Sequence, residues 1–544
     1  MEGRQLPRRE FLATLAAAFP VAAFDWGAFP RGRGPRRATD DYDAIVIGSG
    51  LGGLSCAAAF ARQGFRPLVI EQHDKPGGFA TAFARPGGYV FDASLHSTTV
   101  TPRDGVYNLI PGFPEITEVE FLPHPSLFRA IYPDHDVRVA QRDPAAYVDQ
   151  LTGLFPGERA GIAGLFEDMA GLASEIGRLS AAGGRVDMSR FAVDYPHVLR
   201  FNGRTWGDMV DARLRDPRLK AIVSGQWGYY GLPPSRLSCF YYAIPFMGYL
   251  SAGGYYPRGR SQGISTALAR YIEGHGGTLL LNTRVERILV QGGAATGVAT
   301  ADGRTFSARA VVSNADPFAT FQRMIADRSA LAEYEAAWQR YSVSLSGFQV
   351  FLGLREDLVG RLGIADSEVF LEPDYDPEAS YARALAGDVE HGGVSVTLYD
   401  VVDRGHSPPG KNTVNLLALQ GYGPWERFEA DYAAGRKVAY NRAKQLMADT
   451  LIRKVERALL PGLSRAIEVQ EIGTPLTHAR YTGHRRGAIY GWDQTVSNSG
   501  STRVGHATPI RNLYLAGAWS RPGHGYGAVI PSGLECFAEI VRSW

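Results

Sequence analysis

The sequence predicts an α/β fold, in which an open parallel sheet of βαβ units is interrupted by an inserted α+β domain. Residues 43–71 (DAIVIGSGLGGLSCAAAFARQGFRPLVIE) have the pattern of strand, glycine turn, helix and strand. Residues 512–533 (NLYLAGAWSRPGHGYGAVIPSG), near the other end of the chain, have the pattern of strand, glycine turn and final helix. The long stretches between them mix helical and strand-like periodicity without continuing the βαβ alternation. We therefore predict one nucleotide-binding-type domain assembled from separated pieces.

The first stretch carries a G-x-G-x-x-G turn formed by Gly48, Gly50 and Gly53. Gly48 permits the sharp turn, Gly50 has no Cβ to block a pyrophosphate, and Gly53 allows close packing of helix and sheet. The phosphates would meet free amides at the positive end of the helix. Glu71, which ends the second strand, is placed to accept hydrogen bonds from ribose hydroxyls. A bare glycine loop is the alternative, but strand, helix and acid together favour a Rossmann-like dinucleotide-binding unit.

Further stretches show a family resemblance. Residues 75–81 (KPGGFAT) contain Gly77, Gly78 and Thr81, and residues 89–96 (YVFDASLH) end on a histidine. These resemble the second glycine motif and the FDxGxH stretch of FAD-dependent amine oxidases, phytoene desaturases, carotenoid isomerases and retinol saturases, with Ser94 where glycine is usual. Residues 512–533 resemble the closing flavin motif of the same superfamily.

The resemblance implies FAD as the cofactor and a glutathione-reductase-like FAD-binding domain. Residues 253–317 resemble the stretch that returns the chain to this domain and places a strand at Val285 beside the adenine. Amides near Gly527, Ala528 and Val529 would support negative charge on the reduced flavin. The predicted cofactor-binding residues are Gly48, Gly50, Gly53, Glu71, Gly77, Gly78, Thr81, Val285, Gly517, Gly527, Ala528 and Val529.

The order of these motifs predicts the domain organisation. A signal or basic arm is expected over residues 1–38, and the FAD-binding domain over residues 39–100, 251–317 and 481–544. A substrate domain is expected over residues 101–250 and 318–480.

Composition is typical of a soluble globular enzyme. The chain has 544 residues, of which 45% are hydrophobic and 21% charged, enough for two or more domain-sized cores. The net charge is +2, and no basic stripe with interleaved aromatics lies outside the N-terminus, so we expect no nucleic-acid partner. Cys56, Cys239 and Cys536 are far apart and lack a C-x-x-C pattern, so neither a disulfide framework nor a metal site is predicted.

The N-terminal segment resembles a twin-arginine export signal. Arg8 and Arg9 precede a short apolar run, and residues 21–23 (VAA) form a small-residue cleavage candidate. The run is shorter than a membrane span requires. We therefore predict export, with a periplasmic or membrane-associated location. The alternative is a cytoplasmic, membrane-associated protein with an uncleaved basic arm, which the arginines at 31, 33, 36 and 37 favour.

Flavin hydride chemistry requires positioning, a proton route and exclusion of water more than a nucleophile. Accordingly, no Ser, His and Asp set has the context of a nucleophile elbow. His96 is the first candidate for a proton donor or substrate contact, because the resemblance puts its position beside the flavin ring. Tyr490 and His524 are the other catalytic candidates, together with Trp492. Structural histidines and core aromatics are the alternative interpretation for all of them.

The resemblance implies an apolar lipid substrate, a polyene or another isoprenoid, which is desaturated, saturated or isomerised. Such a lipid gains little on leaving a bilayer, so we expect peripheral membrane contact, through a surface such as residues 240–250 (FYYAIPFMGYL). Side chains that could line an apolar passage are Tyr229, Tyr230, Tyr241 and Tyr242, with core packing as the alternative. Arg485 and Arg486 form either a head-group site or a solvated turn.

Only one dinucleotide fingerprint is present, so no dedicated NADPH domain is predicted. If the protein is exported, quinone or oxygen is the expected electron acceptor. Two other functions stay open: a flavin amine oxidase, which would release peroxide with amines, and a non-enzymatic escort of prenylated partners on the same fold. The intact glycine motifs argue against the escort, which would not need a flavin.

Overall fold

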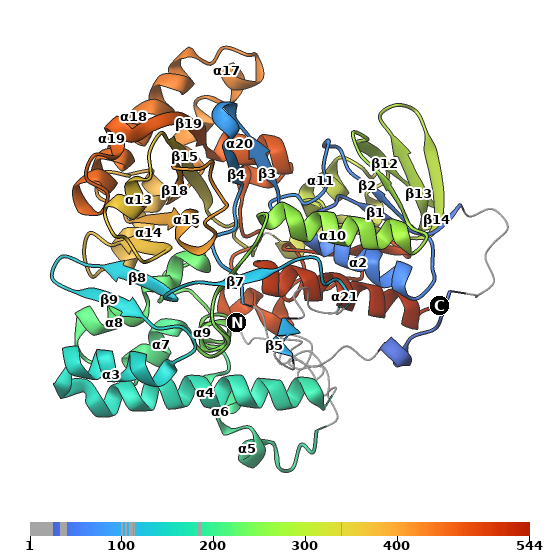
Figure 1. The fold of residues 1–544 in the computed structure, drawn as a ribbon. Coiled ribbons are helices and arrows are strands. Elements are labelled where there is room, and N and C mark those ends of the chain that lie inside the picture. The colour runs from blue at the N-terminus through green and yellow to red at the C-terminus, as the bar shows by residue number, and fades with distance from the viewer. Residues whose placement is uncertain are drawn as a thin grey trace.

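The computed structural model describes residues 26–32, 41–99, 102–103, 106–107, 113, 115–182, 186–338 and 340–544. Within these residues, two seven-stranded sheets form separate layers, and a lobe of helices lies below them in Figure 1. The predicted signal, with Arg8, Arg9 and residues 21–23, lies outside the described residues.

The first sheet is the predicted parallel sheet, with the strand order β11-β2-β1-β14-β13-β12 and β20 paired to β14. Strand β1 pairs in parallel with β2 and β14, whereas β12, β13 and the start of β14 form an antiparallel meander. The strands come from three separated stretches of chain, as the motif order predicts. They are β1 (Tyr42–Ile47), β2 (Pro67–Ile70), β11 (Thr278–Leu280), β12 (Val285–Gln291), β13 (Ala294–Thr300), β14 (Thr305–Ser313) and β20 (Leu513–Leu515).

Three helices cover one face of this sheet: α2 (Leu51–Arg62), α10 (Ser261–Gly274) and α21 (Tyr526–Arg542). Helix α2 is buried almost throughout, because its small side chains allow neighbours on every side. Gly533 makes this packing close, since a Cβ there would lie 2.2 Å from the carbonyl oxygen of Gly52. The hydroxyl of Ser55 donates to the carbonyl of Ile530 at 2.9 Å, which ties α2 to α21.

The second sheet has the order β19-β15-β18-β17-β16-β8-β9. Alternate residues of β15 (Ser346–Leu354), from Phe348 to Leu354, pack in one core with the long helix α18 (Val438–Ala458). The opposite face therefore looks away from α18. The other strands are β8 (Phe128–Ile131), β9 (Asp136–Val139), β16 (Glu368–Leu371), β17 (Val394–Leu398), β18 (Asn412–Gln420) and β19 (Ile467–Gly473).

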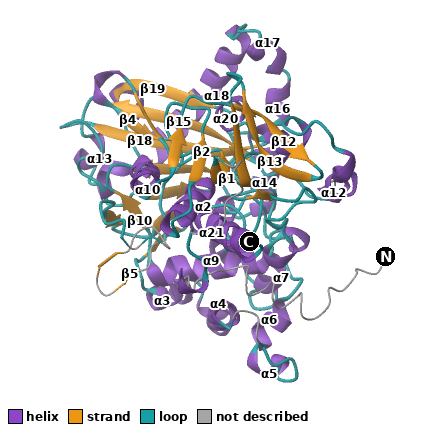
Figure 2. Cartoon of the chain, turned by 90° about the vertical axis from the view of Figure 1, so that its right-hand side faces the viewer, coloured by secondary structure: helices purple, strands orange, loops and turns teal. Residues whose placement is uncertain are grey.

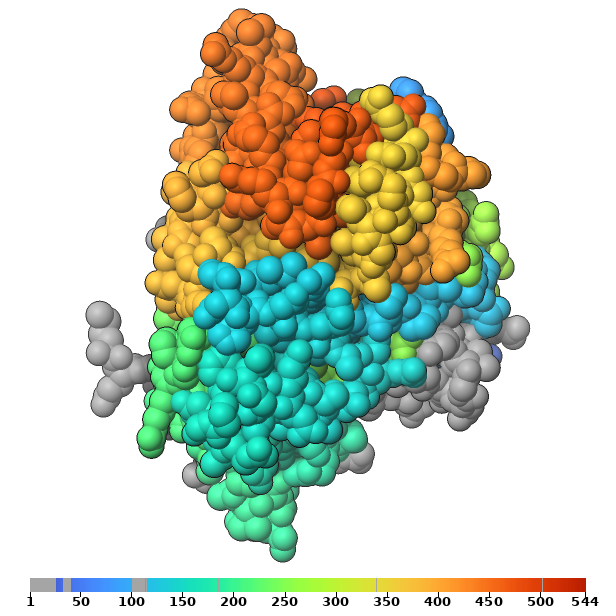
Figure 3. Space-filling model, turned by 60° about the vertical axis from the view of Figure 1, so that its left-hand side comes forward, coloured from blue at the N-terminus to red at the C-terminus, as the bar shows by residue number. Residues whose placement is uncertain are grey.

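The helical lobe joins α3 to α9 around one apolar core. Figure 2 shows these helices below the strands, and Figure 3 shows the teal and green lobe meeting the yellow and orange second-sheet domain on one face. The helices are α3 (Pro144–Leu154), α4 (Arg159–Ala181), α5 (Phe191–Asp194), α6 (Pro196–Phe201), α7 (Trp206–Asp211), α8 (Pro217–Val223) and α9 (Cys239–Ala252).

Helix α9 corrects one prediction. Residues 240–250 were expected to form a membrane-contact surface, but they lie in the lobe core, and only Phe240, Pro245 and Gly248 are half-buried. The run is apolar on all sides because it packs against neighbours on all sides. None of the helices in the described ranges is both long and apolar enough to cross a membrane.

Shorter elements complete the described chain. Two-stranded ladders pair β3 (Ala82–Ala84) with β4 (Val90–Asp92), β5 (Pro102–Arg103) with β6 (Val106–Tyr107), and β7 (Phe121–Pro123) with β10 (Tyr255–Pro257). The remaining helices are α11 (Pro317–Gln322), α12 (Ala332–Trp338), α13 (Leu358–Arg361), α14 (Pro377–Ala386), α15 (Tyr399–Val402), α16 (Gly423–Glu426), α17 (Glu429–Ala433), α19 (Leu463–Ala466) and α20 (Pro475–Thr482), with the 3₁₀ turn η4 (Gly225–Tyr229).

Candidate functional site

The first glycine turn joins β1 to α2. Gly48 has φ = 90°, a conformation that favours glycine. A Cβ on Gly50 would lie 2.7 Å from Nδ2 of Asn314, and one on Gly53 would lie 2.3 Å from the carbonyl oxygen of Gly48. The backbone is therefore bare where α2 begins, and its first amides lack intrahelical partners. This is the surface that a pyrophosphate needs.

Glu71 lies directly after β2, as expected, and it is buried. Its Oε2 accepts hydrogen bonds from the Ser49 amide at 2.8 Å and the Ser49 hydroxyl at 2.6 Å, and Oε1 accepts from the His73 amide at 3.0 Å. A carboxylate has about four acceptor positions, so capacity for a ribose hydroxyl is left. The contacts with Ser49 add a role in holding the turn itself.

The second glycine motif packs against the first. The Gly77 amide donates to the Ser49 carbonyl at 2.9 Å, and a Cβ on Gly78 would lie only 3.2 Å from the Gly50 Cα. The Thr81 hydroxyl donates to Gln262 of α10 at 2.8 Å, so its side chain already has a protein partner.

Gly517 brings the closing motif to the same place. A Cβ on Gly52 would lie 2.6 Å from the Gly517 Cα, and Gly517 itself has φ = 93°. Asn314, which follows β14, lies against both Gly50 and Gly517. Sequence analysis missed Asn314, although its place directly after a strand of the first sheet is a usable signal. The bare backbones of Gly50, Gly78 and Gly517 thus form a cradle that side chains would fill, which fits the FAD expected from the motifs.

A final helix follows the glycine turn, as predicted, and it begins at Tyr526 after Gly525. The amides of Ala528 and Val529 both donate to the Gly525 carbonyl at 2.9 Å. Of the predicted trio, Gly527 is the exposed one, so the helix end can offer its amide to a ligand with less rearrangement. Val285 lies at the first position of β12, where a strand was expected.

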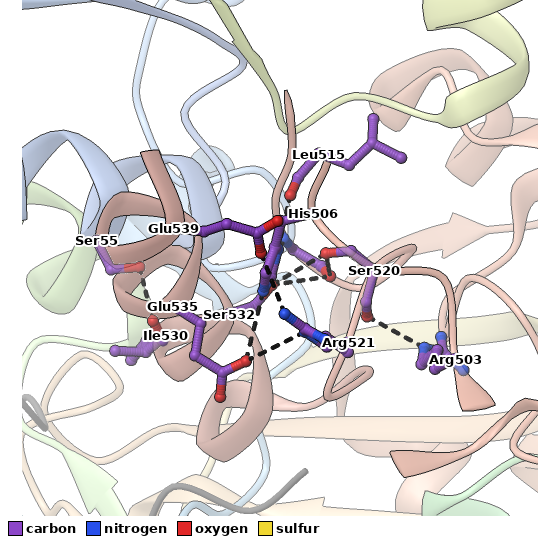
Figure 4. A network of polar contacts seen from close by, with 11 residues as sticks. Ser55, Arg503, His506, Leu515, Ser520, Arg521, Ile530, Ser532, Glu535 and Glu539 are labelled. Atoms are coloured by element: carbon purple, nitrogen blue, oxygen red, sulfur yellow. Dashed lines mark hydrogen bonds and ion pairs between the residues drawn. The ribbon is translucent and has the colours of Figure 1, made fainter. Parts of the chain in front are cut away.

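A polar network fixes the closing motif to α21 (Figure 4). The Gly517 amide donates to the Ser532 hydroxyl at 2.9 Å, and Ser520 lies 3.1 Å from the same hydroxyl. Arg521 forms ion pairs with Glu535 and Glu539 of the helix. The turn between β20 and α21 is therefore held at both ends.

Arg503 is a buried cation that sequence analysis did not find, and no motif marks it. Its guanidinium donates to four carbonyls, those of Trp492, Asn498, Ala518 and Ser520, at 2.6 to 3.3 Å. Burial lowers its pKa to about 10, which leaves it charged at neutral pH. It joins the closing motif to the segment that carries Tyr490.

His96 is buried between the first-sheet motifs and the second sheet. Its Nδ1 lies 2.6 Å from the hydroxyl of Thr397 in β17. Burial lowers the pKa of His96 to about 4, so the ring is neutral at pH 7. Ser94, at the usual glycine position, is not among the residues with positive φ, and its hydroxyl donates to the Phe79 carbonyl at 2.8 Å.

Tyr490 and His524 meet each other, with ring centroids 4.4 Å apart. The Tyr490 hydroxyl donates to the Gly228 carbonyl at 2.6 Å, and His524 Nε2 lies 3.2 Å from the Tyr229 carbonyl. Burial and the nearby Arg503 lower the pKa of His524 to about 3. This pair and His96 make no direct contact among the described residues.

A pocket lies between η4, α14 and strands β16 to β18, with about 740 Å³ of empty space, part of it open to solvent. Glu372 borders it, and burial raises the pKa of this carboxyl to about 8. Most of the lining is apolar or aromatic, including Trp227, Tyr229, Phe370, Leu417, Leu419 and Tyr490.

The other aromatic candidates mainly pack. Trp492 is buried against Trp519, with ring centroids 5.1 Å apart. Tyr242 is buried against Trp206, and Tyr241 donates to the His524 carbonyl at 2.8 Å. Of the four predicted passage tyrosines, only Tyr229 borders this pocket.

The arginine pair forms a turn. The Arg485 amide donates to Asp316 at 2.5 Å, and the side chain of Arg486 lies 3.6 Å from Glu426. Neither side chain borders the pocket.

Sequence analysis also missed Glu368 and Glu372. A signal for both exists, because they are the acids of an otherwise apolar strand run, EVFLE. An acid inside a buried strand demands a partner or a function.

Comparison with known proteins agrees with this architecture. A family model described as flavin containing amine oxidoreductase matches residues 51–383. The chain is 26% identical to prolycopene isomerase 1 of an Oncidium hybrid cultivar over 92% of this chain and 84% of the relative. It is 26% identical to all-trans-retinol 13,14-reductase of Danio rerio over 93% and 87%. An oxidoreductase structure from Methanosarcina mazei aligns with a TM-score of 0.59 at 17% identity, covering 91% of this chain and all of that one.

Proposed function

The chain belongs to the family of flavin-containing amine oxidoreductases and is an FAD-dependent oxidoreductase, and we propose that it acts on carbon–carbon bonds of a polyene or another isoprenoid lipid. The reaction is a desaturation, a saturation or a cis–trans isomerisation. Two relatives that match over most of the chain are named as a prolycopene isomerase and an all-trans-retinol 13,14-reductase, which supports this substrate class.

The observation that carries the proposal is the pocket lining. Trp227, Tyr229, Phe370, Leu417 and Leu419 present apolar and aromatic surface, beside the paired Tyr490 and His524. Such a lining binds by burial of apolar area and leaves few polar groups to orient a hydrophilic substrate.

Different residues of the chain would bind the cofactor and shape the substrate side of the site. The glycine turns at Gly50, Gly78 and Gly517 would hold the dinucleotide, whose flavin supplies hydride transfer. His96 and His524 are neutral at pH 7, because burial depresses the pKa of each. Arg503 fixes the turn that carries His524.

A flavin amine oxidase is the second candidate, and Glu372 favours it. This carboxyl borders the pocket, and burial raises its pKa from the usual 4.5 to about 8, because the charged form is disfavoured there. An ammonium group bound there would restore the ionised form.

One experiment separates the two. The purified protein, checked for its flavin spectrum, is incubated in micelles with prolycopene or all-trans-retinol, and separately with primary amines. A shifted polyene spectrum and a new chromatographic product support the proposal. Peroxide release with amines and unchanged polyenes would overturn it in favour of the oxidase. A colourless protein without flavin would contradict the redox function and would favour a non-enzymatic escort of prenylated partners.

Location and partners complete the proposal. We propose export through the N-terminal twin-arginine-like segment, quinone or oxygen as electron acceptor, and peripheral membrane contact. Since α9 is buried, the surface now favoured for contact is the tip of α5 and α6, where Val193 is 73% and Leu199 54% exposed. Sedimentation with liposomes tests the contact: protein lacking residues 1–38 should pellet, and a V193S/L199S double variant should pellet less. Rapid flavin reduction by NADPH would contradict the choice of acceptor.

A further inference from the structure

A row of polar side chains crosses the second sheet on the face that looks away from α18. Glu368, Thr397 and Asn415 are direct neighbours across β16, β17 and β18, and all three are buried. Paired residues of antiparallel strands point to the same side, so the three side chains share one face. Phe370 and Leu417, which belong to the same face, line the pocket. The polar row therefore lies beside an apolar binding surface.

Glu368 is a fully buried carboxyl, and it forms no ion pair with any residue that the structure describes. Burial raises its pKa well above the usual value, and Thr397 and Tyr229 are the neighbours that lower it. Tyr229, from the pocket wall, donates to Oε2 at 3.5 Å. Oε1 has no hydrogen-bond partner among the described residues. The other titratable neighbours are Tyr249 and Tyr399, so the groups around Glu368 are neutral side chains and the raised pKa favours its protonated form.

Thr397 stands between this acid and His96. Its hydroxyl lies 2.6 Å from His96 Nδ1, while Glu368 is its partner across the strand pair. Nε2 of His96 has no hydrogen bond to any described residue, in contrast to Nδ1. A threonine hydroxyl has a single proton, so it can donate to only one side at a time. The direction of the hydrogen bond between Thr397 and His96 therefore depends on whether the hydroxyl accepts a hydrogen bond from the side of Glu368.

We propose that Glu368, Thr397 and His96 form a proton relay that delivers a proton to the lipid substrate at His96 Nε2 and recovers it in the reverse reaction. The inference rests on the proposed function. When Glu368 holds its proton, it donates through one water to Thr397, Thr397 donates to Nδ1, and the histidine proton is on Nε2. When Glu368 is ionised, every hydrogen bond reverses, and Nε2 becomes an acceptor.

Saturation adds one proton from the relay and one hydride from reduced flavin, and the step balances with these two. The Nε2–H bond breaks, and the π pair of a substrate double bond forms the new C–H bond. At the same time Nδ1 takes the hydroxyl proton of Thr397, and the carboxyl proton of Glu368 replaces it through the water. The neighbouring substrate carbon would take the hydride that FAD supplies in its reduced form when it is bound. Desaturation runs the same transfers backwards, and isomerisation uses protonation and return of the proton at a different geometry.

Several buried polar atoms around the polar row have no hydrogen-bond partner among the described residues, which supports a path for protons. Oε1 of Glu368, both amide atoms of Asn415 and the Ser395 hydroxyl are buried without partners in the described part of the chain. Buried polar atoms without protein partners are the usual places of ordered water. The carboxyl of Glu368 makes no hydrogen bond to Thr397 within the described part of the chain, so the relay places one water between them, which takes the carboxyl proton and donates to the hydroxyl.

The test uses the flavin-loaded protein and the variants E368Q, T397V and T397S. Glutamine keeps the shape of Glu368 but cannot release a proton, and valine removes the relay hydroxyl at nearly constant volume. E368Q and T397V should lower polyene turnover by about 100-fold or more, within the usual range of acid–base catalysis. T397S, which keeps the hydroxyl, should stay within about threefold of wild type.

A matched control is available in the same sheet. Thr413 in β18 also contacts a buried histidine, with its hydroxyl 2.7 Å from Nδ1 of His406, but it lies outside the row. T413V should leave turnover within about threefold of wild type. An equal loss in T413V and T397V would overturn the relay, because it would mean that any buried threonine-to-valine change acts through packing.

Two spectroscopic readouts do not depend on turnover. Infrared difference spectra of wild type against E368Q should show the C=O band of a protonated carboxylic acid at neutral pH. Nitrogen-15 spectra of labelled histidine, assigned with H96Q, should place the proton of His96 on Nε2 in wild type and change in T397V. An ionised Glu368, or a proton on Nδ1 of His96 in wild type, overturns the relay. Wild type that converts no polyene overturns the proposed function instead, so the two failures are distinct.

Discussion

The two sheets of this protein carry function in different ways. At the first sheet the important feature is missing side chains: Gly50, Gly78 and Gly517 leave bare backbone where a Cβ would collide with a neighbour or fill the cradle. At the second sheet it is side chains in an unusual place, since Glu368, Thr397 and Asn415 put polar atoms on a buried face. The first arrangement is local in the chain, and the second exists only after β16, β17 and β18 have paired.

The largest expected effect is at the first sheet. Gly50→Val places its Cβ 2.7 Å from Asn314 and its methyl groups in the space needed by the phosphates, so we expect loss of nearly all bound flavin. The flavin-to-protein ratio from the absorption spectrum measures it. Gly157→Val, at a position where a Cβ meets nothing within 4 Å, is the control and should keep its flavin. A full complement of flavin in the Gly50 variant would contradict the assignment of the cradle.

The features of the first sheet could be predicted from the sequence, whereas the polar row of the second sheet could not. Spacing within a single βαβ unit predicts the places of Gly48, Gly50, Gly53 and Glu71. The glycine turn of the closing motif predicts a helix after it in the same way. Glu368 and Thr397 are 29 positions apart in a strand pairing that no local pattern specifies. Residues 240–250 show the limit of composition, because an apolar run is equally compatible with a docking surface and a buried helix.

The next largest effect is expected at Arg503, because it joins the closing motif to the segment that carries Tyr490. Arg503→Met keeps much of the side-chain bulk but leaves four carbonyls without their donor, so we expect a loss of at least about 3 kcal/mol of stability. Thermal unfolding of flavin-loaded protein measures it. Arg304→Met, at an exposed position, is the control. If both variants unfold at the wild-type temperature, the buried cation does not hold the closing motif.

At the second-sheet domain, the raised pKa of Glu372 makes stability depend on pH. Its folded pKa of about 8 lies above the usual 4.5, so its contribution to stability is complete below pH 4.5 and is lost as pH rises towards 8. Buried histidines with lowered pKa values act in the opposite direction, but only below about pH 6.5. Between pH 6.5 and 8.5, wild type should therefore lose about 1–2 kcal/mol relative to Glu372→Gln, after allowance for solvent screening in the open pocket. Parallel stability curves from denaturant titrations would contradict a raised pKa.

The smallest effect is expected where the two regions touch, at Ser94. The family motif that residues 89–96 resemble has glycine at this position, yet Ser94 adopts an ordinary backbone conformation and its hydroxyl donates to the Phe79 carbonyl at 2.8 Å. Ser94→Ala removes this hydrogen bond and the weaker one between the Ser94 and Tyr526 hydroxyls at 3.4 Å, and should cost about 1 kcal/mol. Ser94→Gly also loosens the unfolded chain and should cost about 0.5 kcal/mol more. Denaturant unfolding of both variants, with flavin content as a second readout, measures the difference. Flavin content should not change in either, because the stronger of the two hydrogen bonds goes to the Phe79 carbonyl and the backbone of Gly50, Gly78 and Gly517 is untouched. If the Ser94→Gly variant proved more stable than Ser94→Ala, the backbone at Ser94 would be strained. The position would then favour the glycine that is usual in the family motif.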